Sequence, residues 1–426
     1  MVGFCRRKNN VIEQWSSLLK LGHKKLSKER DIHWNELLRL GLPEPQESIW
    51  KYTPLDQLID KKFVFPASPQ LGYDFIKKEA FTIDAVRLVF IDGWFVPEFS
   101  DDQYDSFSIK VSQEFAQKEE CSPIISDFFL HLTESLARQV IFIHLKSGII
   151  ARRPLYLLHI SSGSTSNTVF TSHYRHHFQQ DDRSEAVVIE HYISLDNSSH
   201  FTGSRLTVSV GNSAKLTHYN FSFEGRKSYH ISHNDLKIGC ESEVFSHSFL
   251  LGSGLTRHQT SAQLNGERSN LIMNSLMIPI GKEVCESRTF LEHHAGYCIS
   301  SQLHKTIVCD CARAVFNGIM RVLKGANKTK GYIINRNMLL GLFAEVDTQP
   351  HLEIYHDDVQ CGHGATIGDI DKEKVFYLQS RGIDEASAYR MIMYAFISEL
   401  TTMVSYDLIK EELIHRIMKR FSGGVL

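Results

Sequence analysis

The sequence predicts a mainly β protein with helical regions at both ends. Between about residue 139 and residue 360, short apolar runs alternate with small polar turns such as Gly211–Ser213. Before residue 60 and after Asp371, apolar residues recur at the three-to-four spacing of helices. The 426 residues are enough for two or three domains. We place the regions at 1–138, 139–368 and 369–426.

The N-terminal region is predicted to begin with helices and to become mixed after residue 60. Trp15, Leu18 and Leu19 recur at helical spacing, and Gly41–Pro45 ends this part because glycine and proline end helices. The aromatic segment Glu47–Leu55 follows. Taken alone, it is either a turn that docks on the next domain, which is the commoner case, or a binding site.

The central region is predicted to consist of many short strands. Before it, Val86–Val96 has the pattern of a hairpin around the turn Asp92-Gly93. The apolar runs that we assign to strands are Val140–Leu145, Leu155–Ile160, Val187–Ile193, Leu206–Val210, Leu216–Phe223, Val244–Leu251, Leu271–Ile278, Thr306–Val308 and Val315–Val322. This series is typical of a sandwich, a barrel or a stacked β-solenoid. No strict sequence repeat chooses among them.

The C-terminal region is predicted to contain helices at Lys374–Gln379, at Ala386–Thr402 and along the row Leu413, Ile417 and Phe421, with Gly382 as a stop. The second helix carries an apolar row that consists of Tyr389, Ile392, Met393, Phe396, Ile397 and Leu400. Such a row commonly packs on the chain's own β region. The alternative is a docking face for a partner protein.

Composition and missing motifs exclude several classes of function. With 42% hydrophobic residues, 23% charged residues and a net charge of −2, the chain lacks the basic excess of nucleic-acid and anionic-membrane binders. No apolar run approaches the roughly 20 residues that span a bilayer, and the N-terminus is not a secretory signal. Eight cysteines without a CxxC pair fit a reduced, cytoplasmic compartment. Phosphate-loop, GxSxG, HExxH and GxGxxG motifs are missing, so we expect no nucleotide site in this chain.

The strongest candidate for a metal site is the pair Cys361 and His363. They follow an alternating apolar run and lie in what we interpret as a glycine-rich corner, with Gly362, Gly364 and Gly368. Residues two apart in extended backbone project from the same face. Thiol and imidazole could therefore meet at one point as half of a metal site. The other half would have to come from elsewhere in the chain or from another protein.

Three weaker clusters carry metal-ligating side chains. Cys309 and Cys311 are interpreted as a buried structural pair on one face of a strand, with no second pair at zinc-finger spacing. A second, loosely spaced cluster consists of His293, His294, Cys298 and His304. A third lies in a polar stretch that we expect to be exposed, and it consists of His173, His176 and His177. We assign no role to Cys285, Cys298, Cys309 or Cys311.

Several segments together carry a resemblance to a known family. They are Trp50–Leu55, Ser301–Thr306, Ala314–Gly318, Asn337–Leu340, Glu345–Asp347, Pro350–Tyr355, Asp357-Asp-Val-Gln-Cys-Gly-His-Gly-Ala-Thr-Ile-Gly368 and Phe376–Ile383. In this order they resemble the SufB/SufD family of iron–sulfur cluster assembly proteins. The resemblance spans residues 47 to 400, and the block from 350 to 383 is its most specific part.

The resemblance implies a fold, partners and a site. The fold would be a central right-handed parallel β-helix flanked by N-terminal and C-terminal helical regions. The chain would pair with a SufB-like subunit through the β-helices, or with itself when alone, and would bind a SufC-like ATPase through helices between Ala386 and Phe421. His363 matches the family's interface histidine and Cys361 the neighbouring thiol, where iron or a nascent cluster would be held transiently. A reduced flavin is associated with the family's complex, but this chain shows no motif for it.

We therefore expect a non-catalytic scaffold subunit of an ATP-driven assembly complex rather than an enzyme. Two alternatives remain. The first is a β-helix carbohydrate-active enzyme, which needs a carboxylate pair in an open groove. The second is a free-standing metal-binding protein, which would take up metal without partners.

Overall fold

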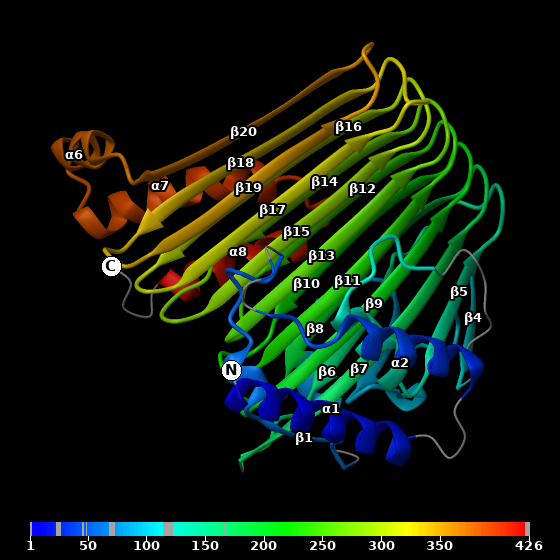
Figure 1. Ribbon diagram of the computed structural model, residues 1–426. Helices are drawn as coiled ribbons and strands as arrows, with labels where there is room; N and C mark the ends of the chain where they lie inside the picture. Colours follow the sequence, from blue (N-terminus) through cyan, green and yellow to red (C-terminus); the bar gives the residue numbers. More distant parts are fainter. Residues whose placement is uncertain are drawn as a thin grey trace.

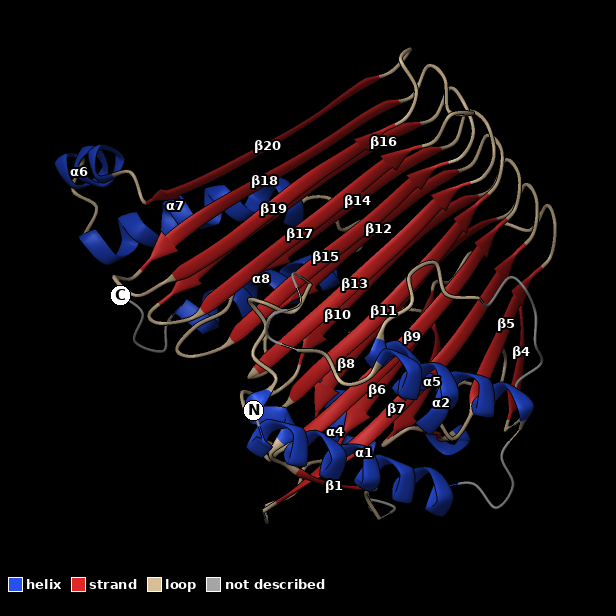
Figure 2. Cartoon of the chain, in the orientation of Figure 1, coloured by secondary structure: helices blue, strands red, loops and turns tan. Residues whose placement is uncertain are grey.

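A computed structural model of the chain describes residues 2–22, 27–44, 47, 49–67, 73–113, 122–165 and 167–421 (Figure 1). Strands dominate it, and helices lie at both ends of the chain (Figure 2). The helices of the first region are α1 (Val2–Gly22), α2 (Lys28–Leu40), α3 (Asp56–Ile59), α4 (Tyr73–Glu79) and α5 (Phe128–Leu136), with a short 3-10 helix at Pro97–Phe99. Those of the last region are α6 (Lys372–Ser380), α7 (Glu385–Thr401) and α8 (Asp407–Phe421).

Two sheets contain all the named strands of the described chain. The first sheet consists of β1 (Lys62–Val64), β4 (Phe107–Ser112), β5 (Val140–Leu145), β7 (Thr168–Gln180), β9 (His200–Val210), β11 (Tyr229–Ile238), β13 (Leu255–Leu264), β15 (Val284–His293), β17 (Arg313–Val322) and β19 (Glu345–Ile354). The second consists of β2 (Val86–Ile91), β3 (Trp94–Phe95), β6 (Leu155–Ser161), β8 (Glu185–Ser194), β10 (Lys215–Phe223), β12 (Glu243–Leu250), β14 (Asn270–Met277), β16 (Ile299–Cys309), β18 (Lys330–Leu340) and β20 (Gln360–Asp369).

The sheets form a parallel β-solenoid. From β5 on, successive strands alternate between the two sheets, and each pairs in parallel with the strand two places along the chain. Paired residues lie one turn apart, for example Tyr229 with Leu255 and Arg313 with Glu345. The turn length therefore varies between these pairs, which explains why the sequence shows no strict repeat. The predicted β-helix is confirmed, and the sandwich and the barrel are excluded.

Three apolar clusters hold the solenoid and the helices together. One fills part of the solenoid interior and includes Leu206, Leu216 and Leu236. A second joins the outer face of the even-numbered strands to α7 and α8, and a third joins the outer face of the odd-numbered strands to α1 and α5. α1 and α5 therefore lie on one outer face of the solenoid, and α7 and α8 lie on the other (Figure 1).

The aromatic segment after α2 docks on the solenoid, as the first of its two interpretations expects. The Arg257 guanidinium lies 3.6 Å from the centre of the Trp50 ring. Thr53 donates a hydrogen bond to Glu286, and Arg288 donates one to the Ile49 carbonyl at 3.1 Å. The first two contacts are buried and the third is partly buried, so charge and aromatic packing hold the N-terminal region on the sheet.

The predicted hairpin is also confirmed, with Asp92 and Gly93 at positive φ between antiparallel strands β2 and β3. β2 additionally pairs in parallel with β6. The sheets therefore begin within the first 138 residues, before the first predicted strand of the central region.

Candidate functional site at the open end of the solenoid

The solenoid ends in two strands whose outer edges are unpaired within the described chain. β19 pairs only with β17, and β20 pairs only with β18. In the middle of the solenoid nearly every strand residue is buried, as in β9 and β11, whereas β20 is mostly exposed. The last turn is therefore an open cross-section of the solenoid interior, and its backbone edges are free to pair with another chain.

Cys361 and His363 lie on the inner face of this open turn. The register pairs Cys361 with Gly331 and His363 with Ile333, and Ile333 is fully buried in the interior cluster. In-register neighbours of a parallel sheet project to the same side, so both side chains point over the interior. Cys361 is half-buried against the core, whereas His363 is exposed.

The electrostatic environment keeps the thiol protonated in the isolated chain. Burial raises the pKa of Cys361 above its ordinary value, although a backbone hydrogen bond with Gly331 acts against this shift. A metal ion binds the thiolate, so binding at Cys361 would release a proton. Among the described residues, no three His, Cys, Asp or Glu side chains are grouped so that they could hold a metal ion. A site built on Cys361 and His363 would need ligands from outside the described chain.

The prediction of a glycine-rich corner around these residues is wrong. Gly362, Gly364 and Gly368 lie inside the regular strand β20, and none of them has a positive φ. The residue-by-residue ladder with β18 keeps the backbone extended. The glycines instead leave the outer face of β20 bare: a side chain at Gly364 or Gly368 would meet nothing within 4 Å.

The weaker metal clusters are not assembled in the fold. His173, His176 and His177, which we expected to be exposed, are buried in β7. Cys309 ends β16 and is buried, while Cys311 is exposed in the following turn after Asp310 at positive φ, so they do not share a strand face. A polar sequence does not imply exposure here, because both faces of β7 are covered. On the inner face His176 contacts His159 of the opposite sheet, and on the outer face His173 contacts Thr133 of α5.

The predicted docking residues of the C-terminal helix face inward. Met393, Ile397 and Leu400 are 0%, 0% and 2% exposed and belong to the cluster beneath α7. The other three, Tyr389, Ile392 and Phe396, are partly buried against the same cluster. The row therefore packs on the chain's own sheet, because it lies opposite apolar side chains of the even-numbered strands. Met393, Ile397 and Leu400 therefore offer no surface to another protein while α7 stays in place, whereas Tyr389, Ile392 and Phe396 keep part of theirs exposed.

Other apolar side chains of the C-terminal region do face solvent. They are Phe376 and Tyr377 on α6, at 71% and 58% exposed, and Met391 and Tyr394 on α7, at 49% and 44%. Figure 1 shows α6 projecting beyond the end of β20. Sequence periodicity favoured the inner row, since a buried row is more regularly apolar than an outward one.

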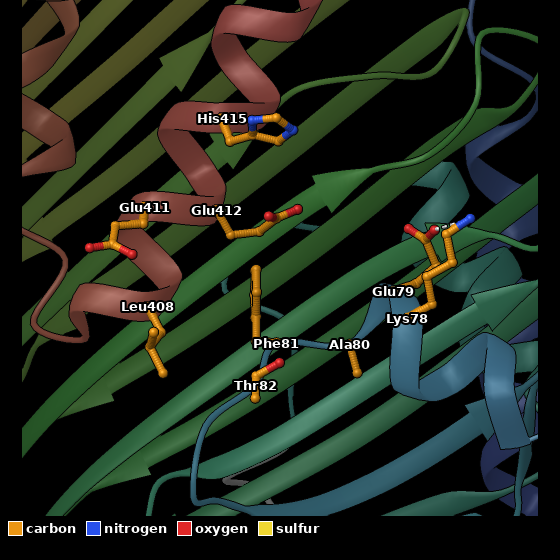
Figure 3. A pocket seen from close by; sticks show the side chains of 9 residues that line it. All are labelled: Lys78, Glu79, Ala80, Phe81, Thr82, Leu408, Glu411, Glu412 and His415. Carbon is orange, nitrogen blue, oxygen red and sulfur yellow. Dashed lines mark ion pairs between the residues drawn. The ribbon is translucent and has the colours of Figure 1, made fainter.

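A groove separates α8 from the end of α4 and the segment that follows it. It has a volume of about 300 Å³ and is lined on one side by Glu411, Glu412 and His415 and on the other by Lys78 and Glu79 (Figure 3). Arg416 donates to Glu412 at 2.6 Å and to Glu79 at 3.2 Å. One guanidinium thus binds both carboxylates, whereas the two carboxyl groups of a glycosidase flank the sugar in an open groove.

Comparison with known proteins decides the family. The family model described as "SUF system FeS cluster assembly, SufBD core domain" matches residues 161–396, more than half of the chain. This chain belongs to the SufB/SufD family. It is 48% identical over 419 residues to the "Iron-sulfur cluster assembly protein SufD" of Escherichia coli (strain K12), covering 98% of both chains. This match confirms the resemblance found in the sequence and indicates a SufD-type member.

Two more distant relatives match shorter or less similar stretches. The "Iron-sulfur cluster assembly SufBD family protein slr0076" of Synechocystis is 26% identical over 86% of this chain and 84% of its own length. "Protein ABCI7, chloroplastic" of Arabidopsis thaliana is 30% identical over 64% of this chain and 59% of its own length. Among the described residues of this SufD-type chain, no helix has the length and apolar character that crossing a bilayer requires.

Proposed function

We propose that the chain is a scaffold subunit for iron–sulfur cluster assembly, whose open solenoid end joins a SufB-like subunit. The observation that carries this proposal is the inner face of the last turn, which is exposed along most of β20 and partly exposed along β19, together with the unpaired edges of both strands. Another β-solenoid can continue both sheets and cover this face, which is β-augmentation on two edges at once. A second copy of this chain would use the same surface when the SufB-like subunit is absent.

Iron or a nascent cluster is the proposed substrate of the interface. Cys361 and His363 supply one thiol and one imidazole, which suit iron, and both point toward the space that the partner would cover. The partner completes the ligand set. Separation of the subunits would expose the site, so assembly and release can follow a motion of either chain. The described residues give no basis for assigning a flavin site.

The expected effect of His363→Ala is an approximately tenfold lower yield of iron–sulfur cluster in the assembled complex. The substitution removes an exposed ligand on the edge of β20 while leaving the ladder with β18 intact. Cluster is measured by visible absorption and by bound iron and sulfide. Pairing with the SufB-like subunit should stay within about twofold, because one exposed side chain contributes little to a large interface.

The matched control for this experiment is His351→Ala. Leu352 pairs with the buried Met320 and therefore projects from the inner face of β19. His351 precedes it in the strand, so its side chain projects from the outer face. Its removal should leave the cluster yield unchanged. Equal yields in the His363 and His351 variants would rule out His363 as a ligand.

A SufC-like ATPase is proposed to dock on the outward face of α6 and α7. This face offers Phe376, Tyr377, Met391 and Tyr394, and exposed aromatic residues are the usual anchors of protein interfaces. ATP-driven movement of the ATPase could then be transmitted to the solenoid through α7, whose inner row is packed on the sheet.

The double substitution Phe376→Glu and Tyr394→Glu is expected to weaken binding of the ATPase at least tenfold, measured by titration calorimetry or by co-purification. Deleting the helices would be a poorer test, since it would uncover apolar residues of the even-numbered strands such as Phe221 and Phe249. Ile32→Glu on α2, at a residue that is 50% exposed on the opposite side of the solenoid, is the control. Unchanged binding by the double variant would contradict docking on this face.

A further inference from the structure

The solenoid interior is divided lengthwise into an apolar half and a polar half. The inward side chains of most odd-numbered strands begin polar and end apolar, as in β9 with His200, Thr202, Ser204, Leu206, Val208 and Val210. β17 is the exception, because its inward residues Ala314, Phe316 and Met320 are all apolar. In the even-numbered strands the order begins reversed, as in β10 with Leu216, His218, Asn220 and Ser222. In β12, β14 and β16 an inward apolar residue follows the polar ones: Leu250, Met277 and Val308. Each even strand leads through a short turn into the next odd strand, so the polar halves of both sheets meet along one side of the solenoid axis.

Buried hydrogen bonds connect the polar side chains into local groups. In the first group, Glu190 accepts hydrogen bonds from Tyr192 at 2.6 Å and from Asn234 at 2.7 Å, and lies 2.9 Å from Nε2 of His218. Burial acts to raise the pKa of Glu190, but the hydrogen bond and charge of His218 lower it well below its ordinary value. A carboxylate is thus retained deep in the solenoid.

Two further groups continue toward the open end. The His258 ring lies 2.7 Å from the Ser232 hydroxyl and 3.1 Å from those of Ser248 and Thr260. The next group is centred on His304, which lies 2.7 Å from the Ser275 hydroxyl and 3.1 Å from Oε1 of Gln302.

The last polar contact is at the open turn itself. Thr348 on β19 donates to Oδ1 of Asn335 on β18 at 2.8 Å. Asn335 pairs with Ala365, the residue two places after His363. The polar side of the interior therefore reaches the turn that carries the candidate site.

Several buried polar atoms in this half have no hydrogen-bond partner within the protein. They belong to residues that are at most 5% exposed: Oδ1 of Asn220, Oδ1 of Asn234, Nε2 of His230, Nε2 of Gln302, Oγ1 of Thr306 and Oδ1 of Asn337. A buried polar atom that is left unsatisfied loses the hydrogen bonds that it makes with water in the unfolded chain, which destabilises the fold. Buried polar atoms in folded proteins are satisfied by protein or by ordered water. Here they recur from turn to turn along the same side.

We propose that ordered water molecules fill the polar half of the solenoid and form a continuous file from Glu190 to the open turn at Asn335 and Thr348. The water bridges the hydrogen-bonded groups by binding the partnerless atoms between them. If the open end is covered by a partner, as the proposed function requires, this file still brings water to the inner side of the turn that carries Cys361 and His363.

The first test is structural and uses the isolated full chain without any cluster. A high-resolution crystal structure should show water within hydrogen-bond distance of Asn234 Oδ1, Gln302 Nε2 and Asn337 Oδ1. Side chains that repack to satisfy these atoms directly, with no water between them, would overturn the proposal. The result does not depend on whether the chain binds a SufB-like subunit, so failure of the proposed function would be seen separately.

The second test measures connection to solvent. Burial lowers the pKa of His304 to about 3, so its ring is neutral at pH 7 and carries one N–H proton. Asn335→Leu replaces the polar side chain nearest the open turn. In this variant, NMR with ¹⁵N-labelled histidine should show that the proton exchanges with bulk water at least tenfold more slowly than in the unsubstituted protein. Ile333→Leu, on the same face of β18 but in the apolar half, is the matched control and should not change the rate. Equal rates in all three proteins would overturn a path through the open end.

Discussion

Replacing Glu134 by glutamine is expected to lower the free energy of unfolding by about 3–5 kcal/mol, because it breaks a buried ion network. Glu134 lies on α5 and contacts Nε of Arg175 at 2.7 Å and Nη1 of Arg205. Asp235 holds the other side of Arg205 at 2.8 Å. Burial acts to raise the pKa of Glu134, but the two arginines hold it at about 2. Without this carboxylate, Arg175 and Arg205 keep their buried charges with too few anions around them.

Urea unfolding at pH 7 measures this effect, and Glu241→Gln is the matched control. Glu241 makes an ion pair with Arg268 at 3.4 Å, but both side chains are more than half exposed. An exposed pair contributes about 0–1 kcal/mol. A loss of similar size in both variants would show that the buried network does not anchor α5 to the solenoid.

Acid should destabilise the protein well before its carboxylates are protonated. Burial lowers the pKa of His159 to about 4 and those of His173, His258 and His304 to about 3. Their folded-state pKa values lie below the unfolded value of about 6.5. The unfolded chain therefore binds more protons between these values, and stability falls as the pH falls from 6.5 toward 3. Each such histidine lowers the free energy of unfolding by about 1.4 kcal/mol for every pH unit that the pH falls in this window.

The urea midpoint should therefore drop steeply from pH 6.5 to pH 5. His304→Gln retains a polar side chain of similar reach but does not titrate, so its stability should depend less on pH over this range. His351→Gln, at a side chain that is 62% exposed, should leave the slope unchanged. A urea midpoint that stays the same from pH 7 to pH 5 would contradict the buried neutral state of these rings.

Local patterns were sufficient for much of the fold. The helices α2, α7 and α8, the stop at Gly382 and the hairpin β2–β3 follow from apolar spacing and turn residues. Strands such as β5 and β6 were predicted at nearly their observed bounds, because their apolar runs are continuous. The positions of Cys361 and His363 on one strand face also follow from spacing in extended backbone.

The apolar pattern of the sequence could not predict strands whose inner faces are polar. β7, β11, β13 and β15 were missed, since histidine, serine, threonine and asparagine alternate in them with other polar residues. Their burial comes from neighbouring turns of the solenoid, which supply the backbone ladders and the hydrogen-bond partners. Nothing within a single strand's sequence shows this.

The amino-acid sequence by itself determined the family resemblance, the helical ends and the pair Cys361 and His363, because each depends on residues close together in the chain. Only the tertiary structure decided that the row of Met393, Ile397 and Leu400 packs inward, that β20 is a straight edge strand and that polar side chains line half of the interior. These features depend on contacts between turns about thirty residues apart. Which face of a helix or strand is covered is settled by those contacts and not by local spacing.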